Sequence, residues 1–128
     1  MYQQRLSDVK YYLPAMGWAV VILVLSAMPS QQLPQIDIIS IDKIGHLGVY
    51  WILTMLILWG ASKQPDANLK IWSQSLSIIL AIGTIYGILI ELMQYLFFPG
   101  RYFEILDALA NFVGCILGII SFKLLFKL

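Results

Sequence analysis

Residue types that can carry chemistry occur at helical spacing within apolar stretches of this sequence. The first set holds Asp42, His46 and Tyr50 at positions i, i+4 and i+8, with Lys43 beside Asp42. On a helix this spacing places the three side chains in one stripe. An imidazole next to a carboxylate is suited to general acid and base catalysis, or to nucleophilic attack when a second group orients the ring.

Two further sets carry carboxylates and amides. Glu91 and Gln94 lie three residues apart, and Tyr86 precedes them by more than one turn. Asp107 and Asn111 lie four residues apart. Glu91 is the most informative of these residues because it lies well inside an apolar run, where an ionisable side chain needs a partner or a function. The three sets together predict a polar site between helices.

Each polar residue also has a structural explanation. Asp42 has the position of an N-cap for a helix that begins just after it. Lys43 and Arg101 fit interfacial anchors, and the amides of the second and third sets are of the type that joins membrane helices. A lone membrane histidine often serves as a structural hydrogen bonder. A chemical role for His46 therefore depends on which groups surround it.

The elements that must position these residues are membrane helices. The 128 residues are 60% hydrophobic and 12% charged, which lies outside the range of soluble domains. Four apolar stretches each approach the roughly 20 residues that a helix needs to cross a bilayer. They cover residues 11–28, 44–62, 76–98 and 105–126. We predict an all-α integral membrane protein, a bundle of four transmembrane helices that forms a single domain over residues 1–128.

The overall charge and the cysteine content exclude several functions. A net charge of +1 provides no strongly basic surface, so we expect no nucleic-acid partner. The single cysteine, Cys115, cannot form an intrachain disulfide. A divalent cation between Asp107 and Glu91 would find oxygen ligands, but their spacing forms no recognisable metal motif. We therefore expect no cofactor.

The basic residues that flank the spans predict the orientation. One side of the membrane receives Arg5, Lys10, Lys63, Lys70, Lys123 and Lys127, and the other receives Lys43 and Arg101. The side richer in basic residues is expected to be cytoplasmic, which places both termini inside the cell. The three polar sets then lie at similar depth near the outer ends of their spans. The predicted pocket is therefore near the outer face.

Small residues predict where two helices approach closely. Gly114 and Gly118 continue the face of Asp107 and Asn111 at the same spacing. Such a pair allows close helix packing, either within the chain or with a partner helix. Before this span, the sequence Pro99-Gly100-Arg101 is typical of a tight turn, because proline ends the preceding helix and glycine relaxes the backbone.

Taken together, these residues resemble the VanZ-like family of small bacterial membrane proteins. The resemblance extends from the first span, where Ser26 and Pro29 also fit, through Gly118. At Leu47 the chain departs from the family, whose members often have an aromatic residue after the histidine; this concerns local packing. The motifs are Asp42-Lys43-x-x-His46-x-x-x-Tyr50, Tyr86-Gly87-x-x-x-Glu91-x-x-Gln94, Pro99-Gly100-Arg101 and Asp107-x-x-x-Asn111-x-x-Gly114-x-x-x-Gly118.

The resemblance implies a multi-pass protein of the bacterial cytoplasmic (inner) membrane with four helices. The namesake of the family is associated with low-level resistance to the glycopeptide antibiotic teicoplanin. Similarity has also been proposed to membrane proteins that exchange or hydrolyse phosphate-linked head groups on lipids. We therefore expect a role in cell-envelope metabolism or glycopeptide resistance, with membrane lipids as partners.

Our main interpretation is an enzyme, a phosphotransferase or phosphohydrolase that processes a lipid-linked or polyprenol-linked phosphate head group. In this interpretation His46 acts as general acid and base or as nucleophile, and Glu91 or Asp107 orients its ring. Lys43 and Arg101 bind the phosphate. The residues that hold polar groups of the substrate or of partner helices are Tyr50, Gln94 and Asn111.

Two other interpretations fit the same residues. One is a non-catalytic protein that binds a lipid-linked cell-wall precursor or a partner protein, with the polar cluster joining its helices. The other is a proton-coupled transporter, since intramembrane carboxylates and histidines can relay protons. Four short helices without a broken pair leave little room for alternating access, which disfavours the transporter.

Overall fold

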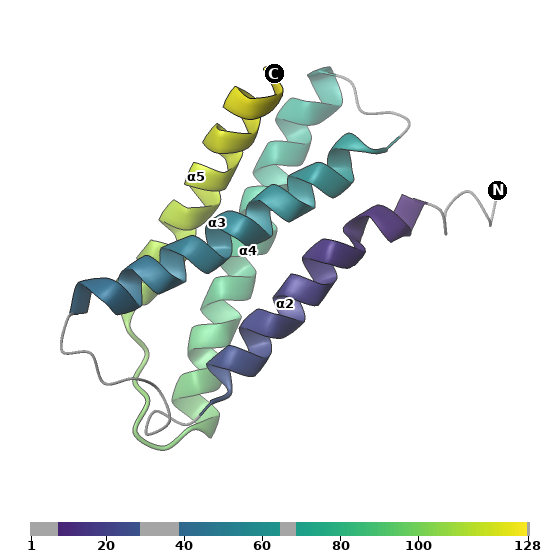
Figure 1. Ribbon diagram of the computed structural model, residues 1–128. Coiled ribbons are helices and arrows are strands. Elements are labelled where there is room, and N and C mark those ends of the chain that lie inside the picture. The colour runs from purple at the N-terminus through teal and green to yellow at the C-terminus, as the bar shows by residue number, and fades with distance from the viewer. Residues whose placement is uncertain (1–7, 29–38, 65–68, 128) are drawn as a thin grey trace.

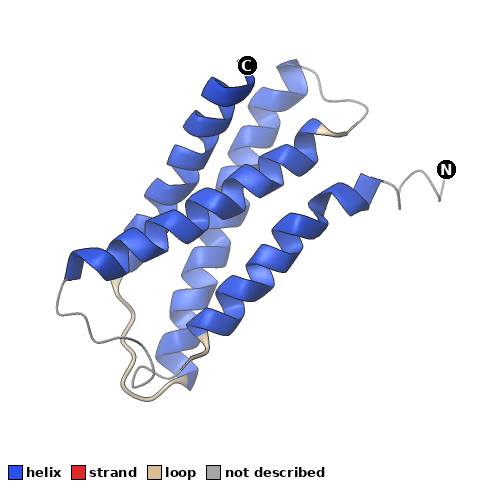
Figure 2. Cartoon of the chain, in the orientation of Figure 1, coloured by secondary structure: helices blue, strands red, loops and turns tan. Residues whose placement is uncertain are grey.

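The computed structural model describes residues 8–28, 39–64 and 69–127 (Figure 1). In these segments all regular structure is helical (Figure 2). The elements are the 3-10 helix η1 (Lys10–Tyr12) and the α-helices α2 (Leu13–Ser26), α3 (Ile39–Ser62), α4 (Leu69–Phe97) and α5 (Ile105–Phe126). The all-α class predicted from the apolar runs is confirmed.

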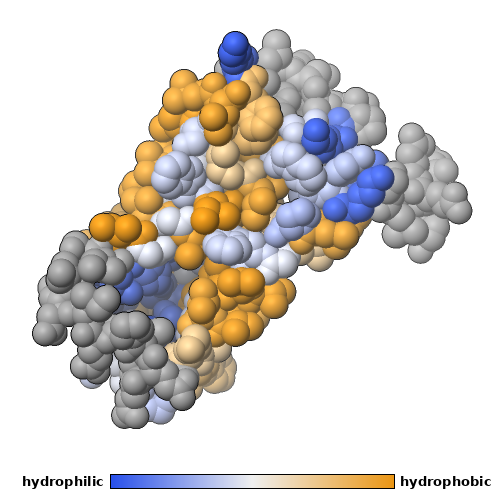
Figure 3. Space-filling model, in the orientation of Figure 1, coloured by the Kyte–Doolittle hydropathy of each residue, from blue (hydrophilic) through white to orange (hydrophobic). Residues whose placement is uncertain are grey.

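The helices have the length and composition of membrane spans. Three are long and apolar enough to cross a membrane, over Asp42–Ser62, Ser75–Phe97 and Ile105–Phe126, and Lys10–Ser26 forms a shorter apolar helix. Figure 3 shows hydrophobic side chains over much of the visible face, with the most hydrophilic ones near the ends of the helices. An apolar surface of this extent would be unfavourable in water but is at no disadvantage in lipid. The chain therefore has the character of a multi-pass membrane protein.

Two helices begin earlier than the hydropathy predicts. α3 begins at Ile39 and α4 at Leu69, whereas the apolar runs predict starts at residues 44 and 76. Helical hydrogen bonding continues through polar residues, while hydropathy detects only the apolar part of a helix. The predicted N-cap role of Asp42 is therefore wrong, because Asp42 lies within the first turn of α3. Its carboxylate there still interacts favourably with the helix dipole.

Parts of two predicted connectors, residues 29–38 and 65–68, lie outside the described residues. The third connector has the predicted geometry. The amide of Arg101 donates to the carbonyl of Phe98 at 3.2 Å, with Pro99 and Gly100 between them. Gly100 has a φ of 84°, which suits the third position of a type II turn. This turn brings Arg101 back towards the bundle.

α3 is the central helix and packs chiefly against α5, with further contacts to α2 and α4. The glycines of α5 make this approach close. A Cβ atom at Gly114 would collide with the carbonyl oxygen of Leu47, and one at Gly118 would lie 2.7 Å from Cβ of Thr54. The close packing predicted for these glycines therefore occurs within the chain, between α5 and α3.

Polar side chains attach α2 to its neighbours. The indole nitrogen of Trp18 donates to the carbonyl of Val49 in α3 at 2.9 Å. The hydroxyl of Tyr86 in α4 donates to the carbonyl of Ala19 at 2.6 Å. Hydrogen bonds of this kind hold helices together in a membrane, where apolar burial gives little driving force.

The start of α2 and the end of α5 lie at the same end of the bundle, as Figure 1 shows. Four helices that alternate in direction produce this arrangement. The assignment of that end to the cytoplasm remains a prediction.

Candidate functional site

Polar side chains from three helices and the turn before α5 converge at the other end of the bundle. α3 contributes the histidine stripe, α4 the buried glutamate and glutamine, and α5 the aspartate and asparagine. The eight residues to which the sequence analysis gives a catalytic or binding role there are Lys43, His46, Tyr50, Glu91, Gln94, Arg101, Asp107 and Asn111. Their contacts, described below, agree with the expectation that the three sets lie at similar depth.

His46 is held through its Nδ1 atom. Nδ1 lies 3.1 Å from Oδ1 of Asn111 and 3.6 Å from Oε1 of Glu91. An amide oxygen only accepts hydrogen bonds, so Nδ1 carries the proton and donates it to Asn111. Glu91 is almost fully buried, with 1% of its side chain exposed. These contacts leave Nε2 as the nitrogen of His46 that can exchange a proton or attack an electrophile.

Two carboxylates lie on the Nε2 side of the ring. Nε2 is 3.8 Å from Oδ1 of Asp42 and 3.7 Å from Oδ2 of Asp107. These distances exceed those of hydrogen bonds but allow strong charge attraction. An imidazolium formed at His46 would therefore be stabilised from both sides of the ring.

Lys43 contacts carboxylates of the α5 region. Its Nζ atom lies 2.6 Å from Oδ1 of Asp107 and 3.2 Å from Oε2 of Glu104. Lys43 thereby neutralises the largely buried Asp107, and it is absent from the lining of the cavity described next. Sequence reasoning missed Glu104, which lies in extended backbone just before α5, so no helical spacing connected it with Lys43.

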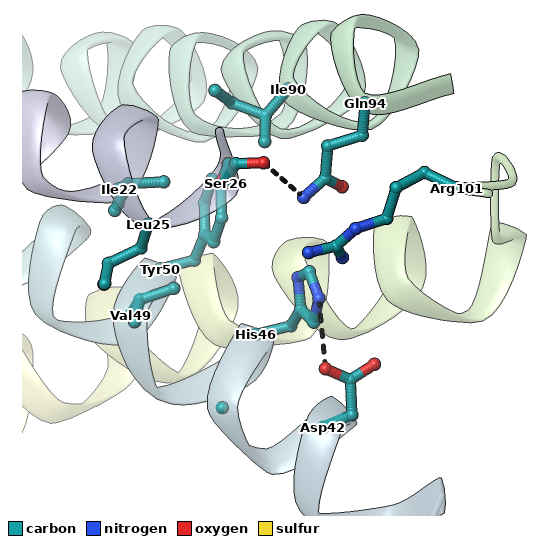
Figure 4. Close-up of a pocket in the computed structure, with 11 residues that line it drawn as sticks. Ile22, Leu25, Ser26, Asp42, His46, Val49, Tyr50, Ile90, Gln94 and Arg101 are labelled. Carbon is teal, nitrogen blue, oxygen red and sulfur yellow. Dashed lines mark hydrogen bonds and ion pairs between the residues drawn. The ribbon is translucent and has the colours of Figure 1, made fainter. Parts of the chain in front are cut away.

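A cavity of about 310 Å³ opens beside His46 (Figure 4). One wall is polar and carries Asp42, His46, Tyr50, Gln94 and Arg101. The other wall is apolar and comes mainly from α2. Of these eight residues, four line this cavity. The other four lie outside its lining: Glu91, Asp107 and Asn111 lie next to His46, and Lys43 contacts Asp107.

Arg101 reaches into the cavity from the turn, and Figure 4 shows its guanidinium beside His46. One terminal nitrogen, Nη2, donates to the carbonyl of Met28 at 3.2 Å. Its buried Nε atom and the buried hydroxyl of Tyr50 have no hydrogen-bond partner among the described residues. Buried polar groups normally have a partner, so these donors favour a ligand with acceptor oxygens.

Gln94 serves a neighbouring helix. Its amide nitrogen donates to the carbonyl of Ser26 in α2 at 3.1 Å. This contact agrees with the alternative in which Gln94 holds a partner helix. It also places Gln94 at the edge of the cavity, where its side chain bridges α4 and α2.

Three residues offer atoms suited to a metal ion. One ligand atom each from Asp42, His46 and Asp107 lie within 4.8 Å of one another. Glu91, which the sequence paired with Asp107 around a cation, is not part of this group. Lys43 already contacts one oxygen of Asp107. The expectation of no cofactor remains a prediction.

The model of the VanZ/LLP1 family matches residues 5–126 of the chain. This range includes every residue of the site and all four helices. No curated protein and no solved structure gave a match. The resemblance noted in the motifs is thus confirmed, and the chain belongs to the VanZ-like family.

Proposed function

We propose that this protein binds a lipid-linked or polyprenol-linked phosphate head group in the cavity and transfers or hydrolyses the phosphate. We place it in the bacterial cytoplasmic membrane, with the cavity at the outer leaflet. The observation that carries the proposal is that His46 and the guanidinium of Arg101 line the same cavity, whose opposite wall is apolar. A reactive nitrogen, an anion-binding group and an apolar wall together suit an amphiphilic phosphate.

Arg101 is the residue that we assign to the phosphate. A guanidinium binds two oxygens of a phosphate through parallel N–H groups, and Nε of Arg101 is a donor without a partner in the described structure. The hydroxyl of Tyr50 can donate to a third oxygen. Lys43, which the sequence also assigned to phosphate, is instead engaged with Asp107 and Glu104. We propose that Lys43 keeps Asp107 in place for His46.

The charges at the site make the protonation of His46 important. The carboxylates described at this end are Asp42, Glu91, Glu104 and Asp107, against the cations Lys43 and Arg101. This excess of negative charge opposes the entry of a phosphate. A proton on Nε2 of His46 reduces the repulsion and supplies another donor. Binding is therefore expected to favour the imidazolium, whereas base or nucleophile chemistry needs the neutral ring.

In the reaction, the bond between phosphorus and the lipid-side oxygen breaks and an acceptor oxygen takes the phosphoryl group. His46 serves through Nε2 in one of two ways. It accepts the proton of water or of an acceptor alcohol and returns it to the departing lipid-side oxygen, or it attacks phosphorus itself and passes the phosphoryl group to the acceptor in a second step, while the departing oxygen takes a proton from water. Asp42 and Asp107 stabilise the positive ring in both cases. A phosphorylated histidine, trapped with labelled substrate, distinguishes attack from proton transfer.

The test uses purified protein and a panel of polyprenyl phosphate, polyprenyl diphosphate and phosphatidic acid, with phosphate release and transfer measured. His46→Gln and Glu91→Gln are compared with the unchanged protein for turnover, thermal unfolding in detergent and glycopeptide susceptibility of cells. We expect both variants to fold and to lose turnover. Absence of turnover on the whole panel, together with an unchanged phenotype of cells carrying His46→Ala, would exclude the enzyme.

A second candidate is a protein that binds a lipid-linked precursor without catalysis. The hydrogen bonds from Trp18, Tyr86 and Gln94 to backbone carbonyls of neighbouring helices favour it, because they show polar side chains joining helices. It predicts that His46→Gln and Glu91→Gln lower the thermal stability together with any function. The same unfolding measurement therefore separates the two candidates.

A further inference from the structure

The cavity is divided into a polar end and an apolar end. In Figure 4, Ile22, Leu25 and Val49 lie to one side and His46 and Arg101 to the other, with the polar residues Ser26 and Tyr50 between them. Ile90 of α4 also lines it. Both ends belong to one cavity of about 310 Å³, so a phosphate and the start of its apolar substituent would bind next to each other.

The cavity reaches the surface between α2 and α3 at Gly45. Gly45 is exposed, lines the cavity, and has no described residue within 4 Å of a Cβ atom built on it. The opposite side of α3 is different, since Gly114 brings α5 against the backbone at Leu47. A ligand extending sideways from the cavity thus finds room on the α2 side of α3 and a closed seam on the α5 side.

We propose that the ligand is a phosphate attached directly to one long apolar chain, and that this chain leaves the cavity between α2 and α3 past Gly45. This inference rests on the proposed function for the phosphate end. Apolar side chains of both helices would contact the chain as it passes into the lipid, which favours binding through buried apolar area. A diacyl lipid has a polar glycerol between the phosphate and its two chains. Between the groups assigned to phosphate and the apolar wall, the lining offers only Ser26 and Tyr50 as polar side chains, which is little for a glycerol with two ester groups.

The test measures binding of three probes to the full chain in nanodiscs: dodecyl phosphate, dioleoyl phosphatidic acid and inorganic phosphate. Gly45→Leu fills the exit. Gly48→Leu is the matched control, because a Cβ atom at Gly48 also has no described residue within 4 Å, but Gly48 does not line the cavity. We expect Gly45→Leu to weaken dodecyl phosphate binding by about tenfold or more and to leave inorganic phosphate unchanged. Gly48→Leu should change neither.

A variant on the other helix guards against a local folding effect. Leu25→Trp narrows the same exit from α2 and should weaken dodecyl phosphate in the same way. Equal effects of Gly45→Leu and Gly48→Leu, or preferential binding of phosphatidic acid, would overturn the inference. If Arg101→Gln abolishes binding of dodecyl phosphate while Gly45→Leu and Leu25→Trp do not affect it, the exit is wrong and the proposed function stands. If no phosphate probe binds the unchanged protein, both fail.

Discussion

Nδ1 of His46 donates to the side-chain oxygen of Asn111 over 3.1 Å, and this bond fixes which nitrogen of the ring is available. The two residues lie 65 positions apart in the chain, so α3 and α5 must be packed before the ring is oriented. The close seam at Gly114 provides that packing. The chemistry proposed for Nε2 thus depends on the same helix contact that supports the fold.

Replacement of Asn111 tests this orientation. Asn111→Ala removes the acceptor for Nδ1, so the ring can turn and Nε2 loses its fixed position. We expect turnover to fall by roughly tenfold or more with little change in substrate affinity, because Asn111 does not line the cavity. Asn111→Asp keeps an acceptor oxygen and should retain more turnover than the alanine variant. Loss of affinity at unchanged turnover would assign Asn111 to the substrate instead.

The pH dependences of binding and turnover should run in opposite directions, because a proton on Nε2 of His46 has opposite effects on the two. As the pH falls, protonation of Nε2 adds positive charge next to the phosphate and strengthens binding. The same protonation removes the free nitrogen that serves as base or nucleophile, so turnover falls. The comparison requires binding of a non-hydrolysable phosphonate lipid and initial rates over the same pH range. His46→Gln should remove the rise in affinity attributable to the ring; an unchanged rise would assign it to the carboxylates.

The seam between α3 and α5 should be the most sensitive part of the fold to added volume. Gly114→Ala places a methyl group against the carbonyl of Leu47, and such overpacking typically costs about 1–3 kcal/mol. Gly48→Ala meets no described residue within 4 Å and should maintain or raise stability, because alanine favours helices by about 1 kcal/mol over glycine. Thermal unfolding in detergent compares the two. Equal melting temperatures would show that the seam yields to the added methyl group.

The sequence predicts the convergence of the polar side chains better than it predicts their pairing. Helical spacing and alternating spans are enough to place His46, Glu91 and Asn111 at one depth, and the structure brings them into contact. The contact between Lys43 and Glu104 is harder to predict, because Glu104 lies in extended backbone before α5, where no periodicity gives the direction of its side chain. The start of α3 also escaped prediction, since hydropathy does not report where hydrogen bonding begins.

The apolar wall of the cavity could not be predicted from the sequence. Ile22 and Leu25 lie in an apolar helix whose side chains are mostly as hydrophobic as they are. Hydropathy gives the same value to a side chain that faces lipid and to one that lines a cavity. Ile22 and Leu25 can be assigned to the cavity wall only when the packing of α2 against α3 and α4 is known.

Removal of divalent cations should leave binding and turnover unchanged. Lys43 already contacts Oδ1 of Asp107, and a metal ion at the group of Asp42, His46 and Asp107 would place further positive charge close to that ammonium. The measurement adds a chelator during assays of lipid phosphate turnover. Inhibition that magnesium or manganese reverses, and that Asp42→Asn abolishes, would instead identify this group as a cation site.

The orientation in the membrane can be tested at the two ends of the bundle. If the termini are cytoplasmic, the turn before α5 faces outward and the end of α3 faces inward. A membrane-impermeant maleimide should then label Tyr102→Cys in intact cells and label Lys63→Cys only after the cells are opened. Both positions are exposed, and the native Cys115 is buried, so background labelling should be low. The reverse labelling pattern would place the cavity at the cytoplasmic face and would redirect the search for its substrate to lipid phosphates of the inner leaflet.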